Sequence, residues 1–470
     1  MKQTIKCLIA AIAAMFVAVS AFAQVTTSAL GGRVTDANGE PVIGAAVIAT
    51  HEPSGTSYGV VSNENGRYTI NGMRTGGPYK VEFSCLGYQT VTYTDLTLQL
   101  AETSSLNATM NEDAQMLSEA MVIGAAASKF SAEKTGAATN ISSNQITSLP
   151  TVSRSITDVT RLSPYGGNGM SFAGSDGRTA NFTVDGANFN NNFGLTDNLP
   201  GGGNPISIDA IEELQVVISP YDVRQTNFIG GGVNAITKSG TNKFKGTAYV
   251  YHRNENMRGN QVAGTEIAGA RDRDRNTTYG FTLGGPIIKN KLFFFVNAEY
   301  TSSPGTAVSW RARKNDEEAS TEKNLSWTTV EDMEKVQAHA MDKYGYDTGS
   351  FTDFPADMST VRVLARLDWN INDKNKLAVR YNYTNNNRWS APNGSSMDGG
   401  TRSAYNRTSL YSMAFANSMY SQNNLVHSAS LDLNTRISDD LSNQLLVTFS
   451  KLDDVRGSNS DEFPFIDIHD

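Results

Sequence analysis

The sequence contains little cysteine, lacks long apolar runs beyond its N-terminus and has no excess of positive charge. Two cysteines occur among 470 residues, and Cys7 lies in an N-terminal segment that is expected to be removed. Cys85 then stands alone, which excludes an intramolecular disulfide. Later apolar runs fall well short of the roughly 20 residues that a membrane-spanning helix needs. A formal charge of −8 gives no basic surface of the kind that binds nucleic acid.

The N-terminus has the pattern of a secretory signal peptide. Two lysines precede an apolar stretch at 8–19, and the small-residue sequence AFAQ follows it. This pattern predicts a signal peptide over 1–23, cut between Ala23 and Gln24. The alternative, a buried N-terminal helix, is expected to show a polar face, which this stretch lacks. The sequence therefore predicts an exported protein that is stable without disulfides.

The sequence of residues 24–112 predicts a small domain made mainly of β-strands. Short β-patterned runs alternate with turn sequences such as DANGEP and SNENGR, and Gly39 and Gly66 stand where hairpin turns need positive φ. The run GGRVTDANGEPVIGAAV, followed by SNENGRYTINGM and YKVEFSCLGYQ, resembles the carboxypeptidase regulatory-like domain. The resemblance implies a β-sandwich classed with starch-binding-like folds and an accessory role. Sugar binding does not follow from the fold.

The sequence offers no convincing catalytic set. His252 and Glu255 have the H-x-x-E spacing of two zinc ligands, but a catalytic zinc needs a third protein ligand and an open position. The other histidines stand in no supporting motif. In GGGVNAITKSGTN, Thr237 precedes the lysine where a phosphate-binding P-loop needs glycine. We therefore expect no enzymatic activity, cofactor or metal.

Residues 113–134 form a predicted linker that contains a short apolar run. LSEAMVIG at 117–124 precedes the Ser-, Ala- and Gly-rich sequence AAASKFSAEKTGAA. A brief strand between flexible residues suits pairing with the sheet edge of another protein, where main-chain hydrogen bonds supply the affinity. The alternative is that the run is the last strand of the neighbouring sandwich, and composition alone does not decide between the two.

Residues 135–242 form a predicted α+β region rich in Asn, Gly and Ser. Strands are predicted in ANFTVDGANF and IEELQVVIS. The acidic pair Glu212 and Glu213, which follows Asp209, is predicted to be exposed at a helix N-terminus or turn.

Residues 243–470 show side chains alternating with period two, which is typical of β-strands. In TVRVLARLDWNIN, one set is apolar and is expected to face lipid: Val361, Val363, Leu367, Trp369 and Ile371. The other set is polar and is expected to face a wet lumen or an inner domain: Arg362, Arg366, Asp368 and Asn370. The same alternation recurs at 377–384, 292–300 and 429–437, and more faintly at 443–451.

The connections between these predicted strands alternate in length. The long ones are 253–276, 302–359 and 386–424, and the short ones are KNK, NDKN and SDDLS. Outer-membrane barrels have long loops outside and short turns on the periplasmic side. The fold class is therefore mainly β, with roughly seven strands of a transmembrane antiparallel barrel. Because bacterial single-chain barrels have an even number of strands, the sequence is expected to be the N-terminal portion of a longer protein.

The runs NFTVDGANFNN, IDAIEELQVVISPYDVRQTNFIGGGVNAITKSGTNKFKG and LGGPIIKNKLFFFVNAEY resemble the plug and first barrel strands of TonB-dependent outer-membrane receptors. The Oar-like branch fits best, since the A-x-Y-G-S-R-G-A-N-G run typical of SusC-type receptors is absent. The resemblance implies a plug at 135–242, a partial barrel at 243–470 and import of an unidentified extracellular ligand. It also implies the TonB box, at these residues: Glu119, Ala120, Met121, Val122, Ile123 and Gly124.

The resemblance further implies location in the outer membrane of a Gram-negative bacterium, surrounded by outer-membrane lipid. TonB, with its inner-membrane proton-driven complex, is the implied partner. The sandwich and plug are expected on the periplasmic side and the long loops outside. An alternative function is a surface receptor or adhesin that binds matrix or protein without transport. A helix predicted in TTVEDMEKVQAHAMDKYG suits either function, although such a helix more often packs against its own loop.

Overall fold

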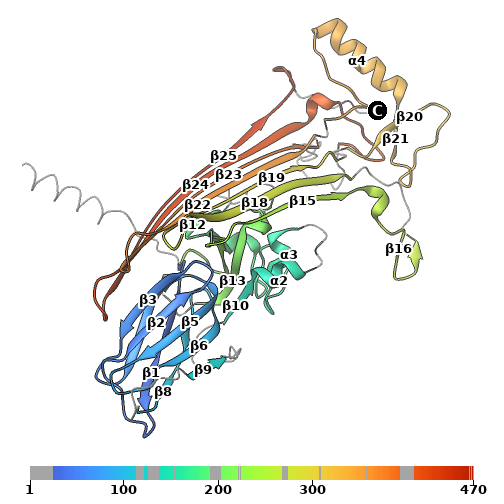
Figure 1. Ribbon diagram of the computed structural model, residues 1–470. Helices are drawn as coiled ribbons and strands as arrows, with labels where there is room; N and C mark the ends of the chain where they lie inside the picture. Colours follow the sequence, from blue (N-terminus) through green and yellow to red (C-terminus); the bar gives the residue numbers. More distant parts are fainter. Residues whose placement is uncertain are drawn as a thin grey trace, which may run out of the picture.

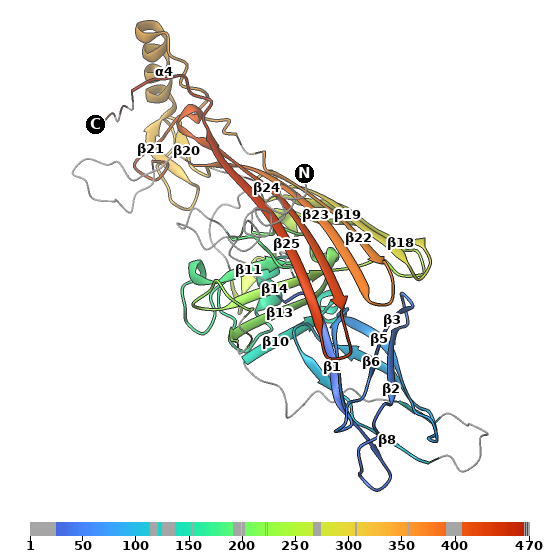
Figure 2. The ribbon, with the colours of Figure 1, turned by 90° about the vertical axis from the view of Figure 1, so that its left-hand side faces the viewer.

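The structure is a computed structural model in which three β-rich bodies follow one another along the chain (Figure 1). We call them the sandwich, the plug and the barrel wall. In Figures 1 and 2 the blue sandwich lies beyond one end of the tall barrel wall, and helix α4 (Val330–Tyr344) lies beyond the other. The structure describes residues 25–112, 121–124, 137–149, 151, 154–190, 199, 203–220, 222, 224–266, 274–305, 308–355, 357–391, 407–464, 466 and 468.

The sandwich consists of two sheets packed on a common apolar core. One sheet contains β1 (Ser28–Asp36), β4 (Arg67–Met73), β7 (Thr103–Ser105) and β8 (Ala108–Met110). The other has the order β3 (Thr56–Val61), β2 (Ala46–His51), β5 (Gly76–Ser84), β6 (Val91–Leu98) and β9 (Met121–Gly124). Val34, Tyr79 and Phe83 are fully buried between them. Gly39 and Gly66 have φ of 86° and 72°, which confirms the predicted turns.

The plug is a five-stranded mixed sheet with short helices. Its strand order is β10 (Ala137–Ser142), β13 (Ile211–Ser219), β14 (Gly232–Thr237), β11 (Asn181–Val184) and β12 (Ala187–Asn188). The helices are α2 (Ser143–Ser148), α3 (Ile156–Thr160), η1 (Gly177–Thr179) and η2 (Ile208–Ala210). Phe182 and Leu214 belong to its core, which continues into Phe295 and Leu364 of the barrel wall. The plug therefore packs directly against the inner face of the wall.

The barrel wall is a seven-stranded antiparallel sheet whose strands follow sequence order. They are β15 (Lys245–Arg253), β18 (Asn276–Ile288), β19 (Leu292–Ser302), β22 (Ser359–Asn370), β23 (Asn375–Ser390), β24 (Tyr420–Arg436) and β25 (Ser442–Gly457). The predicted number of strands is confirmed, and within the described residues the sheet does not close on itself.

The two faces of the barrel wall differ as the alternation predicted. On β22, Leu367 and Trp369 are 45% and 42% exposed on the outer face, whereas Arg362 and Asp368 are only 6% and 3% exposed on the inner face. Since the plug covers the inner face, polar side chains there contact protein while the outer face stays apolar. This is the pattern of an outer-membrane barrel strand.

The predicted alternation of long and short connections is also confirmed, with one boundary corrected. The loop expected at 386–424 is shorter, because β23 and β24 keep pairing outward as far as Ser390 and Tyr420. The residues at these far ends of β23 and β24 are mostly polar, so the alternation of apolar side chains could not predict that they belong to strands. We call the three short turns, at 289–291, 371–374 and 437–441, the short-turn rim.

The long loops carry small elements of their own. They are η3 (Glu255–Met257), β16 (Gln261–Val262), β17 (Thr265–Glu266), β20 (Arg311–Arg313), β21 (Leu325–Thr329), α4 and η4 (Ala416–Ser418). Helix α4 begins at a capping box between Thr329 and Asp332 and ends at Gly345, whose φ is 63°. Met333 packs against Phe351, so the predicted helix rests on its own loop. No helix in the described ranges is long and apolar enough to cross a membrane.

Candidate functional site at the junction of plug, barrel wall and sandwich

A tight hairpin turn brings a plug carboxylate to the barrel wall. β11 and β12 are joined by Asp185 and Gly186, whose φ values of 43° and 80° are both positive, as a two-residue type I′ turn requires. The Asp185 carboxylate is buried. It accepts hydrogen bonds from the backbone N of Thr237 at 2.9 Å and from the Thr237 hydroxyl at 2.6 Å. The turn therefore fixes one negative charge at the inner face of the wall.

Two arginines of the barrel wall face this carboxylate. Arg366 Nη1 lies 3.5 Å from Asp185 Oδ1 and donates to the Thr237 carbonyl at 2.8 Å. Arg380 Nε lies 3.5 Å from Asp185 Oδ2. Asp368 in turn lies 2.9 Å from Arg366 Nη2. We call this group, made of Asp185, Thr237, Arg366, Asp368 and Arg380, the Asp185 anchor.

A second buried polar contact holds the plug where η2 begins. Ser207, the N-cap of η2, donates its hydroxyl to Glu299 Oε2 at 2.8 Å. Tyr249 donates to the same oxygen at 2.9 Å, and Arg362 Nη1 lies 2.9 Å from Glu299 Oε1. Arg362 Nε also donates to the carbonyl of Asn204 in the plug at 2.6 Å. We call these five residues the Glu299 anchor.

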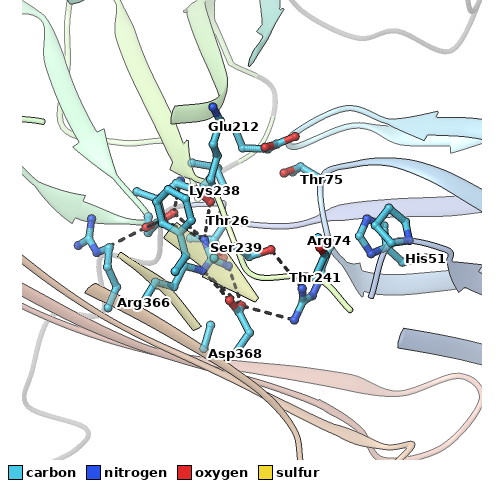
Figure 3. Close-up of a pocket in the computed structure, with 18 of the residues that line it drawn as sticks. Thr26, His51, Arg74, Thr75, Glu212, Lys238, Ser239, Thr241, Arg366 and Asp368 are labelled. Atoms are coloured by element: carbon cyan, nitrogen blue, oxygen red, sulfur yellow. Dashed lines mark hydrogen bonds and ion pairs between the residues drawn. The ribbon is translucent and has the colours of Figure 1, made fainter. Parts of the chain in front are cut away.

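The sandwich reaches the Asp185 anchor through one arginine. Arg74 lies in the turn between β4 and β5, and Figure 3 shows its side chain extending toward Asp368. Its Nη2 lies 3.6 Å from Asp368 Oδ1, and its Nη1 donates to the Ser239 hydroxyl at 3.1 Å. The guanidinium also lies 5.4 Å from the ring centre of Phe293 in β19. Sandwich, plug and barrel wall therefore meet at Asp368.

Further hydrogen bonds join the sandwich to the end of the barrel wall where the short turns lie. They are Asn370 Nδ2 to Thr56 Oγ1 at 2.9 Å, Asn242 N to the Pro53 carbonyl at 2.8 Å, and Arg436 Nη1 to the Gly59 carbonyl at 2.5 Å. They come from loops and strands far apart in the sequence. The sandwich is thus docked on the short-turn rim, the side that the resemblance implied, but no sequence pattern predicted these contacts.

A cavity of about 870 Å³ lies between the three bodies (Figure 3). Charges of both signs line it, from Arg74, Asp185, Glu212, Lys238, Lys245, Arg366, Asp368, Lys376, Arg380 and Asp432. His51 also lines it. Burial, and then the charge of Arg74, lowers the pKa of His51 to about 3. This histidine is therefore neutral at physiological pH, and its ring is hydrogen-bonded to Ser54 at 2.7 Å.

The prediction for the acidic pair is wrong for Glu213. η2 ends at Ala210 and β13 begins at Ile211, so Glu213 lies inside a strand that faces the sandwich. It is 5% exposed and accepts the backbone N–H of Leu100 at 3.0 Å. Burial raises the pKa of Glu213 to about 7, and burial also raises the pKa of Glu212. Local sequence gave no signal for this contact, because the partner lies about a hundred residues away.

The predicted TonB box is described only in part. Met121–Gly124 forms β9, which pairs in parallel with β6, from Val91 opposite Met121 to Thr94 opposite Gly124. Glu119 and Ala120 lie outside the described residues, as do Ala23 and Gln24 of the predicted cleavage site. β9 is the edge strand of the sandwich sheet, which is the arrangement of the alternative given above. A role in TonB binding stays a prediction.

The remaining candidate motif has an ordinary structural role. His252, in β15, is hydrogen-bonded through Nδ1 to the hydroxyl of Thr277 on the neighbouring strand at 2.8 Å. Glu255 begins η3 in the loop that follows. In the part of the chain that the structure describes, no three His, Cys, Asp or Glu side chains are grouped to hold a metal.

Sequence reasoning identified the barrel half of both anchors but not their partners. Arg362 and Arg366 were predicted to face the lumen or an inner domain, and they contact the plug. The sequence Asp185-Gly186 between two β-runs is a hairpin signal that was available in the sequence. Arg74 carries no comparable signal, because its partners come from other bodies.

Comparison with known proteins identifies two domains. Residues 29–111 match the carboxypeptidase regulatory-like domain, and residues 236–313 match the outer membrane beta barrel domain. The chain is 26% identical over 386 residues to the TonB-dependent transporter Oar of Myxococcus xanthus, covering 78% of this chain and 34% of Oar. It is 33% identical over 119 residues to the TonB-dependent receptor SusC of Bacteroides thetaiotaomicron, covering 25% of this chain and 10% of SusC. The chain thus spans about a third or less of the length of these relatives.

Two solved structures of outer-membrane proteins match this chain at low identity. The siderophore receptor PirA from Pseudomonas aeruginosa matches with a TM-score of 0.42 and 11% identity, covering 69% of this chain and 42% of PirA. The outer membrane transporter YddB from Escherichia coli matches with a TM-score of 0.44 and 12% identity, covering 69% of this chain and 40% of YddB.

The two domain matches and the curated relatives confirm the resemblance to TonB-dependent outer-membrane receptors. The protein is located in the outer membrane of a Gram-negative bacterium.

Proposed function

We propose that this chain forms part of a TonB-dependent transporter that imports an unidentified ligand with energy from the inner-membrane proton gradient. The observation that carries the proposal is that a separate domain, the plug, occupies the inner face of the barrel wall and shares its core with Phe295 and Leu364. A passage blocked in this way needs work to open. A surface receptor or adhesin, the alternative function, needs no such inner domain.

The chemistry of the two anchors supports a plug that moves. Both are built from ion pairs and hydrogen bonds, and each such bond contributes only about 0.5–3 kcal/mol net. Water can replace these partners once a gap opens between plug and wall. A modest shift of the plug therefore breaks contacts that can form again, and no apolar surface of the plug has to enter lipid.

TonB is proposed to act on the segment from Glu119 to Gly124. A short extended segment can add to the edge of a partner's sheet, and main-chain hydrogen bonds then give the affinity. Pulling on this segment from the periplasm moves the plug relative to the wall, and the ligand passes.

The test is the binding of the full-length gene product, in detergent, to the periplasmic C-terminal domain of TonB from the same organism. Biolayer interferometry compares the intact protein with a variant that lacks 117–124 and with a control that lacks 127–134, a deletion of equal length in the same linker. We expect binding by the intact protein and the control, and its loss on deletion of 117–124. Equal binding by all three proteins contradicts the assigned TonB contact, and no binding by any favours the alternative function.

A further inference from the structure

The sandwich covers the end of the plug that faces the periplasm. Its docking contacts involve β22, β24 and the segment that leads into β15, so they spread along the short-turn rim. Two more contacts join it to the plug. The Leu100 carbonyl accepts from Gln215 at 2.8 Å, and the Val25 carbonyl accepts from Asn234 at 2.6 Å. A ligand that passed the plug on this side would meet the sandwich next.

Arg74 makes an ion pair between the sandwich and the barrel wall. Its side chain is 15% exposed, and that of its partner Asp368 is 4% exposed. Asp368 is also bound by Arg366, which reaches Asp185 in the plug. Movement of the sandwich away from the rim therefore removes one of the two guanidinium groups that neutralise Asp368, next to the contact that holds the plug.

We propose that the sandwich is a gate over the periplasmic end of the passage, held closed by Arg74, and that it closes this side of the cavity until it leaves the rim. The closed state has the Arg74–Asp368 contact at its centre and hydrogen bonds such as that of Arg436 to the Gly59 carbonyl around it, so opening exchanges these polar partners for water. The gate is a property of the resting protein, and its existence does not depend on TonB.

The first test measures access to the cavity. Ala378 lines the cavity from β23, and Cys85 is the cysteine that remains after signal cleavage. The full-length protein with Cys85→Ser and Ala378→Cys is reacted in detergent with a polyethylene-glycol maleimide that is too bulky to pass between the docked sandwich and the rim. We expect Arg74→Ala to raise the labelling rate by roughly tenfold or more, because it leaves Asp368 with one partner fewer in a buried site.

The matched control is Arg67→Ala. Arg67 belongs to β4, the strand that precedes Arg74, but it is exposed and pairs with Arg33 inside the sandwich. This control is expected to label as slowly as the parent protein. Equal labelling rates for Arg74→Ala and Arg67→Ala overturn the proposal.

A second measurement reports the closed position directly. A Cβ built on Gly72 lies 3.4 Å from the Cβ of Asn434, close to the roughly 3.5–4.5 Å of bonded cysteines. The φ of 70° at Gly72 makes a cysteine there strained, so the parent with Gly72→Cys alone is checked for folding. With Cys85→Ser, the pair Gly72→Cys and Asn434→Cys is expected to form a disulfide readily on oxidation, and more slowly when Arg74→Ala is added. Failure of the disulfide to form in a folded protein that retains Arg74 overturns the closed gate.

The outcomes separate the gate from the proposed function. Both measurements use purified protein without TonB, so a gate that responds to Arg74→Ala stands even if the TonB-binding test fails. If TonB binds as proposed while Arg74→Ala changes neither labelling nor disulfide formation, the transporter proposal stands and the gate is wrong.

Discussion

At the residue scale, the junction depends on buried charges whose partners are far away in the sequence. Arg362 and Glu299 show the limit of sequence analysis. The alternation correctly predicted that both side chains point inward, because that depends on strand geometry alone. It did not predict that Ser207 and Asn204 of the plug complete their hydrogen bonds, because pairing between bodies depends on how whole domains dock.

The buried carboxyl of Glu213 should make stability depend on pH. Its folded pKa of about 7 lies above the ordinary value of 4.5, so folding favours the protonated form. Stability from this group is therefore present below about pH 4.5 and is lost as pH rises through about 7, by up to about 3 kcal/mol. We expect Glu213→Gln, which keeps an acceptor for Leu100, to reduce the fall in melting temperature between about pH 5 and about pH 8. The exposed Glu64→Gln is the control, and an unchanged fall in Glu213→Gln contradicts the assignment.

The Glu299 anchor should lose stability when only one partner is removed. Both side chains of the Arg362–Glu299 pair are 8% exposed, so Arg362→Met leaves a buried carboxylate without its cation, at a cost of about 3–5 kcal/mol. Thermal unfolding in detergent measures the effect, and adding Glu299→Gln should recover part of it. The control is Lys80→Met in the pair of Lys80 with Glu82, whose side chains are 41% and 40% exposed, and it should cost less than about 1 kcal/mol. Equal effects of the two single substitutions contradict a buried anchor.

At the element scale, the strands were predictable because each has one set of side chains that faces the plug and another, alternating set that faces outward. β22 and β23 alternate in sequence as they do in burial, and short turns join strands at one end only. The ends of β23 and β24 that lie farthest from the short-turn rim were not predicted. Their paired residues are mostly polar and therefore show no apolar alternation. The pairing of β9 with the sandwich was one of two alternatives that the sequence left open, because a short apolar run suits many sheet edges.

A substitution at Leu367 tests whether the outer face of β22 contacts lipid. Leu367 is 45% exposed on the apolar side of β22, next to the inward-facing Arg366. Leu367→Arg places a charge in lipid, at a cost of about 2–4 kcal/mol near the middle of the bilayer. We expect less folded receptor in the outer membrane, measured by the heat-dependent mobility shift of barrels on gels. Leu367→Ile should leave the amount unchanged, and normal assembly of the arginine variant contradicts a lipid-facing position.

At the scale of the whole molecule, β9 connects the proposed TonB contact to the proposed gate. Because β9 is a strand of the sandwich sheet, a pull on Met121–Gly124 acts on the sandwich before it acts on the plug. The rate at which Gly72→Cys and Asn434→Cys form a disulfide after a pulse of oxidant should therefore be lower in cells with TonB than in cells without it. Deletion of 117–124 should abolish the difference, and equal rates in cells with and without TonB contradict this coupling.

The order of the three bodies could be predicted from sequence, but their contacts could not. Hydrophobic periodicity and turn residues are local properties, and they predicted the strands, whereas the sandwich and the plug were assigned from the two family resemblances. The docking of the sandwich on the rim depends on Arg74 and on backbone carbonyls such as those of Pro53 and Gly59, which no sequence pattern marks.

The central claim is that the barrel wall has lipid on one side and the plug on the other. Single cysteines placed along 363–369 of the full-length protein, with Cys85→Ser, can be labelled with an environment-sensitive dye in liposomes that contain nitroxide lipids. We expect strong quenching at Val363, Ala365, Leu367 and Trp369 and weak quenching at Leu364, Arg366 and Asp368. Uniform quenching along the strand, or the opposite alternation, would contradict the account.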